Sequence, residues 1–192
     1  MKKRIIIGIS GASGVIYGIK LLEALKDKEI ETHLIISDAG KENMAIETSY
    51  KPEDVMALAD YAYGNKNIGA AVASGSFLTD GMVIAPCSIK TLSGIANSYN
   101  DNLMIRAADV TLKEKRKLVL LVRETPLHKG HLRLMLEAAD LGAHILPPIP
   151  SFYHMPTTIE DIILQTIGKV LDYLAIPHHL FQRWEGIDLS EE

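Results

Sequence analysis

The stretch RIIIGISGASGV, residues 4–15, decides the fold of this chain. It begins as an apolar run and then enters a turn made of glycine, serine and alanine. Residues 15–28 follow with isoleucine and leucine at helical spacing. A strand, a glycine-rich turn and a helix in this order predict the first βα unit of an α/β protein.

The turn of this unit is suited to an anion. Glycines at positions 8, 11 and 14 let the backbone approach a ligand closely. The N–H groups that open the next helix, together with the hydroxyls of Ser10 and Ser13, supply donors. The spacing differs from the dinucleotide fingerprint and from the Walker loop, so it does not favour NAD or ATP. We therefore expect either a phosphate cradle or a tight turn that binds nothing.

The rest of the chain alternates in the same way. Short, continuous apolar runs predict strands covered on both faces, at residues 32–37, 82–85, 118–122 and 143–146. Helical patterns lie between and after these runs, at residues 38–46, 53–62, 88–98, 101–114, 128–141 and 158–174. The alternation predicts an α/β fold with a three-layer, doubly wound, Rossmann-like parallel sheet, whose ligands bind beyond the carboxyl ends of the strands.

Length and composition define the class of protein. The 192 residues, 47% of them hydrophobic, can form one core, so we expect a single domain over residues 1–185 and a flexible acidic tail over residues 186–192. A net charge of −4 does not favour a nucleic-acid partner, and no apolar run is long enough to span a membrane. The single cysteine excludes internal disulfides and cysteine-built metal sites, which indicates a cytoplasmic protein.

Polar residues that could carry chemistry follow two of the predicted strands. Ser88 and Thr91 come directly after one buried run and form a second turn that could face an anion. Arg123 and Glu124 come directly after the next run, where this architecture places functional residues. An ordinary solvated ion pair is an equally good interpretation of Arg123 and Glu124 from the sequence.

Other reactive side chains have a structural interpretation. Cys87 lies in a buried run and is interpreted as a small hydrophobic residue rather than a nucleophile. His128, His131 and His154 lack the convergent partners that a tetrahedral metal site needs. We therefore expect no metal.

A set of short motifs, taken together, resembles the flavin prenyltransferases of the UbiX family. The motifs follow the family's order over essentially the whole chain: GISGASG at 8–14, LIIS at 34–37, ET at 47–48, ASGS at 73–76, PCSIKTL at 86–92, RAADVTLKEKR at 106–116, LVRETPLH at 121–128, PPIPSFYH at 147–154 and RW at 183–184. The resemblance implies a flavoprotein fold similar to that of the flavin-binding cysteine decarboxylases. It also implies a homo-oligomer in which trimers pack into a dodecamer, with FMN between subunits.

The same resemblance implies the ligands and their contacts. Reduced FMN is expected to contact Gly11, Ala12, Ser13, Ser37, Ser88, Ile89, Lys90, Thr91 and Arg123. The phosphate of a second substrate, dimethylallyl phosphate, is expected to contact Arg106, Lys113, Tyr153 and Lys169, with Ser74 and Ser76 nearby.

The implied reaction transfers the dimethylallyl group to N5 and then to C6 of reduced FMN. Cations such as Lys113 neutralise the leaving phosphate, while Glu124 protonates it and can then serve as a base. Trp184 offers a π surface to an allylic cation, and Glu47 and Ser13 position the N5 region. The prenylated FMN is implied to serve a separate UbiD-type decarboxylase.

Two other functions stay open at this stage. An FMN-dependent decarboxylase of the cysteine type would share the fold and the FMN site, although PCSIKT at residues 86–91 differs from the motif of those enzymes. A flavin carrier, or the accessory subunit of an aromatic acid decarboxylase, would bind FMN without transferring a prenyl group. Prenyl transfer by the isolated chain separates the enzyme from the carrier.

Overall fold

The computed structural model describes residues 2–26 and 28–186. The predicted tail at 186–192 therefore lies outside the described residues, apart from Gly186. The chain forms two compact units, Met1–Pro148 and Ile149–Glu192. Among the described residues, no helix is both long and apolar enough to cross a membrane.

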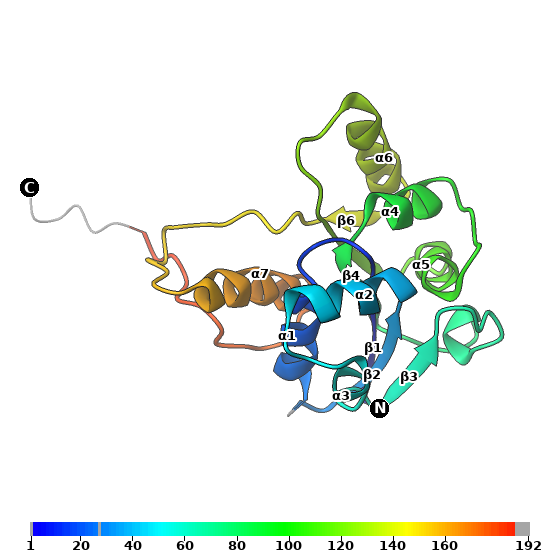
Figure 1. The fold of residues 1–192 in the computed structure, drawn as a ribbon, viewed down its shortest axis with the longest axis horizontal. Coiled ribbons are helices and arrows are strands. Elements are labelled where there is room, and N and C mark those ends of the chain that lie inside the picture. Colours follow the sequence, from blue (N-terminus) through cyan, green and yellow to red (C-terminus); the bar gives the residue numbers. More distant parts are fainter. Residues whose placement is uncertain (1, 27, 187–192) are drawn as a thin grey trace, which may run out of the picture. The chain divides into compact units, whose positions relative to one another are not determined.

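The first unit is a parallel sheet with its strands joined by helices (Figure 1). Its strands are β1 (Lys3–Ile9), β2 (Ile30–Ile36), β3 (Tyr61–Gly64), β4 (Gly81–Cys87), β5 (Lys117–Val122) and β6 (Ala143–Ile145). Its helices are α1 (Ile16–Leu25), α2 (Asp38–Glu47), α3 (Pro52–Met56), α4 (Ile89–Ala96), α5 (Leu103–Lys113) and α6 (Lys129–Asp140), with a short 3₁₀ turn at Ala71–Ala73. The order across the sheet is β3-β2-β1-β4-β5-β6, and every neighbouring pair is parallel. The predicted doubly wound parallel sheet is confirmed.

The central strands form because both of their faces are covered. Ile5, Ile6 and Ile7 are at most 2% exposed, as expected for a parallel strand between two layers of helices. Helix α1 contacts β1 and β4 on one face, while α5 contacts β4 and β5 on the other (Figure 1). Burial on both faces explains why these strands read as continuous apolar runs rather than as an alternation.

One predicted helix is wrong. The helix expected over residues 53–62 ends at Met56, and the chain then forms β3, which pairs with β2 at the edge of the sheet. Proline at the first position starts α3 correctly, but the sequence YAYG that follows is too short for its pattern to reveal a strand. Pairing with the exposed edge of β2 supplies the hydrogen bonds that the local pattern does not predict.

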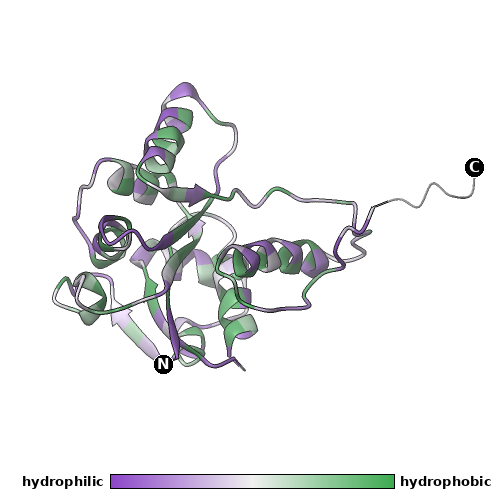
Figure 2. Cartoon of the chain, turned by 180° about the vertical axis from the view of Figure 1, so that it is seen from behind, coloured by the Kyte–Doolittle hydropathy of each residue, from purple (hydrophilic) through white to green (hydrophobic). Residues whose placement is uncertain are grey.

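The second unit is built on one long helix, α7 (Ile159–Tyr173). Thr158 caps this helix: its hydroxyl accepts from the N–H of Asp161 at 3.1 Å, and the carboxylate of Asp161 accepts from the N–H of Thr158 at 2.8 Å. This reciprocal pair satisfies two N–H groups that the helix cannot satisfy itself. Bands of hydrophobic and hydrophilic residues alternate along α7 (Figure 2), as in an amphipathic helix.

We expect Gly18→Ala to destabilise the first unit. A methyl group on Gly18 in α1 would meet the carbonyl oxygen of Ala85 in β4 and would lie 2.6 Å from Cγ1 of Ile9 in β1. Because a backbone carbonyl in a buried strand cannot move aside, the substitution should cost about 2 kcal/mol, which corresponds to roughly 4–8 °C in the thermal midpoint.

Gly64→Ala is the matched control. Gly64 ends the edge strand β3, and no heavy atom lies within 4 Å of the position of its added methyl group. The control should melt within about 1 °C of the wild type. If Gly18→Ala melted at the same temperature as Gly64→Ala, α1 would not approach β4 as closely as described.

Candidate functional site

The carboxyl ends of β1 and β4 are joined at the centre of the sheet. The N–H and the hydroxyl of Ser10 both donate to the carbonyl oxygen of Pro86, at 3.2 and 2.8 Å. The same hydroxyl accepts from the N–H of Ser88 at 2.8 Å. Ser10 is therefore a buried structural residue, and its hydroxyl is not a free donor for a ligand.

A cavity of about 360 Å³ opens beside this junction. It is lined by residues that follow β1, β2, β3 and β4 and by the start of α5, namely Gly11, Ser37, Asp38, Ala39, Asn65, Lys66, Ser88, Lys90, Thr91, Asp101, Asn102, Met104 and Ile105. In the strand order of this sheet, the chain reverses its direction of winding between β1 and β4. Open α/β sheets bind ligands at such a switch point.

Two helices present their N-termini to the cavity with donors to spare. Ser37 caps α2 by accepting from the N–H of Gly40 at 3.0 Å, and Ser88 caps α4 by accepting from the N–H of Thr91 at 3.3 Å. These caps satisfy the third N–H group of each helix, so the first two are left for a ligand. The positive ends of two helices favour a dianion such as a phosphate monoester.

The third helix at the cavity, α5, is capped by the protein itself. The side chain of Asn65 accepts from the N–H of Met104 at 3.0 Å, and its carbonyl accepts from the N–H of Leu103 at 2.8 Å. Asn102 accepts from the N–H of Ile105 at 3.1 Å. Met104 and Ile105 can then serve as an apolar wall of the cavity instead of an anion site.

The first turn of the chain is likewise occupied by the protein's own anion. The N–H groups of Gly14 and Val15, which open α1, donate to Oε2 of Glu47 at 2.8 and 3.3 Å. In this structure the carboxylate of Glu47 therefore takes the place at these N–H groups that the sequence analysis gave to a ligand phosphate. Ser13 lies in the same turn as an exposed side chain, so the structure does bring Glu47 and the Ser13 turn together.

Arg123 and Glu124 lie at the carboxyl end of β5. The N–H of Arg123 donates to the carbonyl oxygen of Cys87 at 3.1 Å, which holds this turn against the end of β4. Both side chains are exposed, and Oε1 of Glu124 accepts from the N–H of Thr125 at 2.9 Å. Neither residue lines the cavity.

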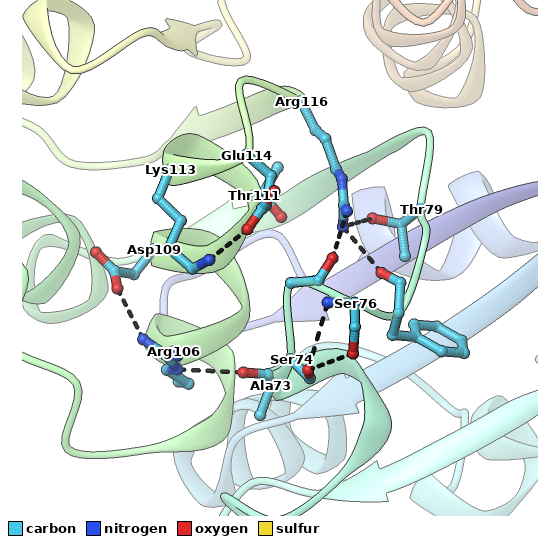
Figure 3. A network of polar contacts seen from close by, with 12 residues as sticks. Ala73, Ser74, Ser76, Thr79, Arg106, Asp109, Thr111, Lys113, Glu114 and Arg116 are labelled. Atoms are coloured by element: carbon cyan, nitrogen blue, oxygen red, sulfur yellow. Dashed lines mark hydrogen bonds and ion pairs between the residues drawn. The ribbon is translucent and has the colours of Figure 1, made fainter.

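Four residues predicted to contact the second substrate lie along α5 and the loop beside it (Figure 3). Arg106 donates from Nε to the carbonyl oxygen of Ala73 at 3.2 Å and from NH1 to Asp109 at 3.1 Å. Lys113 is paired with Glu114 and lowers the pKa of that carboxyl group. The hydroxyls of Ser74 and Ser76 are 2.9 Å apart. The two cations therefore lie near the serines, but each already has a carboxylate partner.

The remaining predicted residues belong to the second unit. The rings of Tyr153 and Trp184 meet edge to face, with 6.3 Å between their centroids. The hydroxyl of Tyr153 accepts from Nε2 of Gln165 at 3.2 Å. Nζ of Lys169 lies 3.9 Å from a carboxylate oxygen of Asp172 on the next turn of α7. Tyr153, Trp184 and Lys169 are thus tied to one helix and the segment that follows it.

Sequence reasoning missed several residues that shape these sites. Asn65 and Asn102 cap α5, and Asp172 anchors the segment that carries Trp184. Asn102 precedes a helical pattern, so capping preference could have found it. Asn65 and Asp172 act on partners that tertiary structure brings to them, and no local signal marks them.

The histidines do not form a metal centre. Among residues 2–26 and 28–186, no group of three or more histidine, cysteine, aspartate or glutamate side chains could hold a metal ion. The rings of His128 and His131 contact each other at a tilt of 34°, with 3.5 Å between their centroids, and Nδ1 of His128 accepts from the N–H of Gly130 at 3.0 Å. These histidines shape the start of α6.

The first comparison with known proteins concerns sequence. A family model described as Flavoprotein matches residues 1–174, which spans the boundary between the two units. A flavin prenyltransferase UbiX from Escherichia coli (strain K12) is 58% identical over 187 residues, which are 96% of this chain and 99% of that relative.

Solved structures agree with the sequence comparison. A structure of AnUbiX (PadA1) in complex with FMN and dimethylallyl pyrophosphate has a TM-score of 0.96 and 46% identity, and it covers 98% of this chain and 100% of its own. A dodecameric FMN-dependent Ubix-like decarboxylase from Escherichia coli O157:H7 has a TM-score of 0.93 and 45% identity, covering 95% of this chain and 100% of its own.

We expect Cys87 to be unreactive in the folded protein. Its side chain is fully buried at the end of β4, and burial raises the pKa of the thiol far above its ordinary value. An aromatic disulfide reagent at pH 8 should titrate less than about a tenth of a thiol per native chain, and the chain's single thiol after denaturation. Rapid titration of the native protein would contradict the described burial.

Proposed function

The chain belongs to the UbiX family of flavin prenyltransferases, and on that basis we propose that it transfers the dimethylallyl group of dimethylallyl phosphate to N5 and C6 of reduced FMN. One observation in the structure carries this proposal beyond the family assignment. The cavity at the switch point joins the N-termini of α2 and α4, whose first two N–H groups stay open beside their serine caps, to an apolar wall. This arrangement fits a ligand that carries both a phosphate and a flat ring system.

The residues of the cavity fit FMN. The N-termini of α2 and α4, with the hydroxyls of Ser37, Ser88 and Thr91, would hold the phosphate. Lys90 at the rim adds a positive charge, and Gly11 lets the start of α2 approach the end of β1, because a methyl group on Gly11 would strike Ala39. Ala12, Ser13, Ile89 and Arg123 complete the proposed FMN contacts. FMN supplies the nucleophilic ring that accepts the prenyl group.

The phosphate of dimethylallyl phosphate would be held by cations. Arg106 and Lys113 of α5, with Ser74 and Ser76 beside them, offer charge and hydroxyl donors in the first unit. Tyr153 and Lys169 offer a hydroxyl and an ammonium in the second unit. Since a monophosphate leaves slowly unless its charge is neutralised, this set of donors lowers the barrier to leaving.

Protonation of the leaving phosphate is assigned to Glu124, which can then take a proton as a base. Its carboxylate is exposed at the end of β5, where it can reach a ligand that extends from the carboxyl edge of the sheet. Glu47 fixes the backbone of the Ser13 turn, so this pair would set the position of the ring atoms that react. Trp184, 59% exposed, offers its face to an allylic cation.

We infer that the working form is a homo-oligomer, with the dodecamer of a solved relative as its model. Large apolar side chains are exposed on the first unit, among them Leu132 and Leu136 on α6, at 53% and 61%. Apolar surface of this kind is normally covered by a partner. The proposed ligand contacts are divided among the cavity, α5 and the second unit. Assembly would bring contact residues from different copies together.

The family match to residues 1–174 supports treating 1–185 as one flavin-binding domain.

The proposed setting of the reaction rests on the family. The family resemblance implies that the prenylated FMN serves a separate UbiD-type decarboxylase, which is the proposed consumer. The single cysteine, kept as a thiol, suits the reducing cytoplasm.

One alternative has a specific observation in its favour, since a solved relative is called an FMN-dependent Ubix-like decarboxylase. Decarboxylation of a cysteine-type substrate, or storage of flavin by a carrier, would use the same cavity. Both alternatives would leave FMN without an added prenyl group.

The test is anaerobic incubation of the purified chain with reduced FMN and dimethylallyl phosphate, followed by the mass of the extracted flavin. We expect the mass to rise by one five-carbon prenyl unit. Unmodified FMN recovered from a folded, flavin-loaded protein would reject the transferase and leave the carrier and decarboxylase functions.

We expect Glu124→Gln to slow prenylation by roughly 10²–10⁴-fold, because the amide cannot protonate the leaving phosphate. FMN binding should stay within about twofold of the wild type, since the side chain does not line the cavity. The measurement is the single-turnover rate of prenylation beside a flavin titration. Glu53→Gln, the same change on exposed α3, is the control. An undiminished rate in Glu124→Gln would remove the acid role.

A further inference from the structure

A single carboxylate, that of Asp172, organises the end of the described chain. Arg183 holds it with two hydrogen bonds, NH1 to Oδ2 at 3.0 Å and NH2 to Oδ1 at 2.6 Å. His178 approaches the same carboxylate with Nε2 at 3.0 Å from Oδ1. Asp172 thus links α7 to two points in residues 175–184, which we call the C-terminal segment.

The tautomer of His178 follows from its other contact. Its Nδ1 accepts from the backbone N–H of Leu180 at 3.2 Å, so the ring proton lies on Nε2 and is donated to Asp172. The ring is buried, with a side-chain exposure of 2%. The carboxylate of Asp172 thus accepts from the buried ring of His178 and from both ends of the Arg183 guanidinium. Such charge-assisted contacts are specific in geometry.

Steric contact places the C-terminal segment against the same helix. A methyl group on Gly168, one turn before Asp172, would lie 2.7 Å from Cε1 of His178 and would also strike the ring of Phe181. The guanidinium of Arg183 lies over the ring of Phe181, 5.4 Å from its centroid. The segment therefore rests directly on α7 at Gly168 and is tied to it at Asp172.

The residue that follows Arg183 is Trp184, whose ring meets Tyr153 edge to face. Gln165, two turns before Asp172 on α7, holds the hydroxyl of Tyr153. The two aromatic rings are thus fixed from the same helix, one through Gln165 and the other through Asp172 and Arg183. Lys169 is held by Asp172 less tightly than Arg183 is, because its ammonium lies 3.9 Å from the carboxylate and is half exposed. It is therefore more available to an anionic ligand.

We propose that Asp172 is a positioning residue of the prenyl transfer: through Arg183 it holds Trp184 beside Tyr153, and it leaves Lys169 available for the substrate phosphate. This inference rests on the proposed function, which places Tyr153, Lys169 and Trp184 at the second substrate. The hydrogen bonds from Arg183, together with the one from His178, outweigh the effect of burial and lower the pKa of Asp172 to about 2, so the anchor is charged near neutral pH.

The first measurement is spectroscopic and does not depend on the reaction. Trp184 is the only tryptophan of the chain, so its emission reports on this segment alone. At equal flavin content, Asp172→Asn should lower the tryptophan anisotropy and raise acrylamide quenching by about twofold, because the amide cannot hold the guanidinium in a bidentate ion pair. Arg183→Lys keeps the positive charge but loses the two-pronged hydrogen bond. Its anisotropy and quenching should lie between those of the wild type and Asp172→Asn.

The second measurement is kinetic. In Asp172→Asn, kcat for prenylation should fall about fivefold or more while KM for dimethylallyl phosphate stays within about twofold, since a face that stabilises a cation acts mainly in the transition state. Asp172→Asn combined with Arg183→Gln should be no slower than either single variant, because both remove the same pair. Glu185→Gln, the same carboxylate-to-amide change beside the indole, should match the wild type in both measurements.

The outcomes separate the two proposals. Unchanged tryptophan signals in both Asp172→Asn and Arg183→Lys would overturn the positioning role, whatever the activity. Changed signals with an unchanged kcat would also overturn it, because the ring would then be free to move without consequence. A wild-type protein that adds no prenyl unit would reject the proposed function, while the fluorescence would still show whether Asp172 holds Trp184.

Discussion

The rest of the structure depends on the parallel pairing of β1 with two neighbours, β2 on one side and β4 on the other. Because the chain winds away from β1 in opposite directions on its two edges, the helices that follow β2 and β4 open at the same place. Ser10 joins the carboxyl ends of β1 and β4, because its hydroxyl hydrogen-bonds to the backbone of Pro86 and Ser88. A cavity at the carboxyl edge is the geometric consequence, and its position does not depend on the identity of the ligand.

Electrostatics then decides which helix end is left for a ligand. The N-termini of α1, α2, α4 and α5 could each attract an anion, but α1 is neutralised by Glu47 and α5 is capped by Asn65 and Asn102. Only α2 and α4 keep unbonded N–H groups in their first turns beside the cavity. The protein thus directs a dianion to one corner by satisfying the competing ends with its own side chains, since a helix terminus that already carries a carboxylate gains little from a second anion.

The cations proposed to bind the second phosphate follow another pattern. Arg106, Lys113 and Lys169 each lie beside a carboxylate, namely Asp109, Glu114 and Asp172. Ion pairs that water can reach contribute only about 0–1 kcal/mol, and the ammonium groups of Lys113 and Lys169 are about half exposed, so a phosphate dianion can compete for them at small cost. These ion pairs orient the long side chains, and their positive charge can still attract a ligand. Arg183 differs, because its bidentate geometry fixes a backbone segment and so the position of an aromatic ring.

The sequence by itself determined the layered fold and the edge at which the site lies, because apolar runs buried on both faces and the glycine turn after β1 are local patterns. It also indicated Ser88 and Thr91 as ligand-facing residues, since polar side chains stand where a buried strand gives way to a helix, while Ser37 came from the family resemblance. Only the tertiary structure decided that Glu47 takes the N–H groups of the first turn, that β3 exists, and that Asp172 meets Arg183. These features depend on groups 11 to 33 residues apart in the chain, and periodicity or spacing carries no information about which distant charge or strand edge will fill a local vacancy.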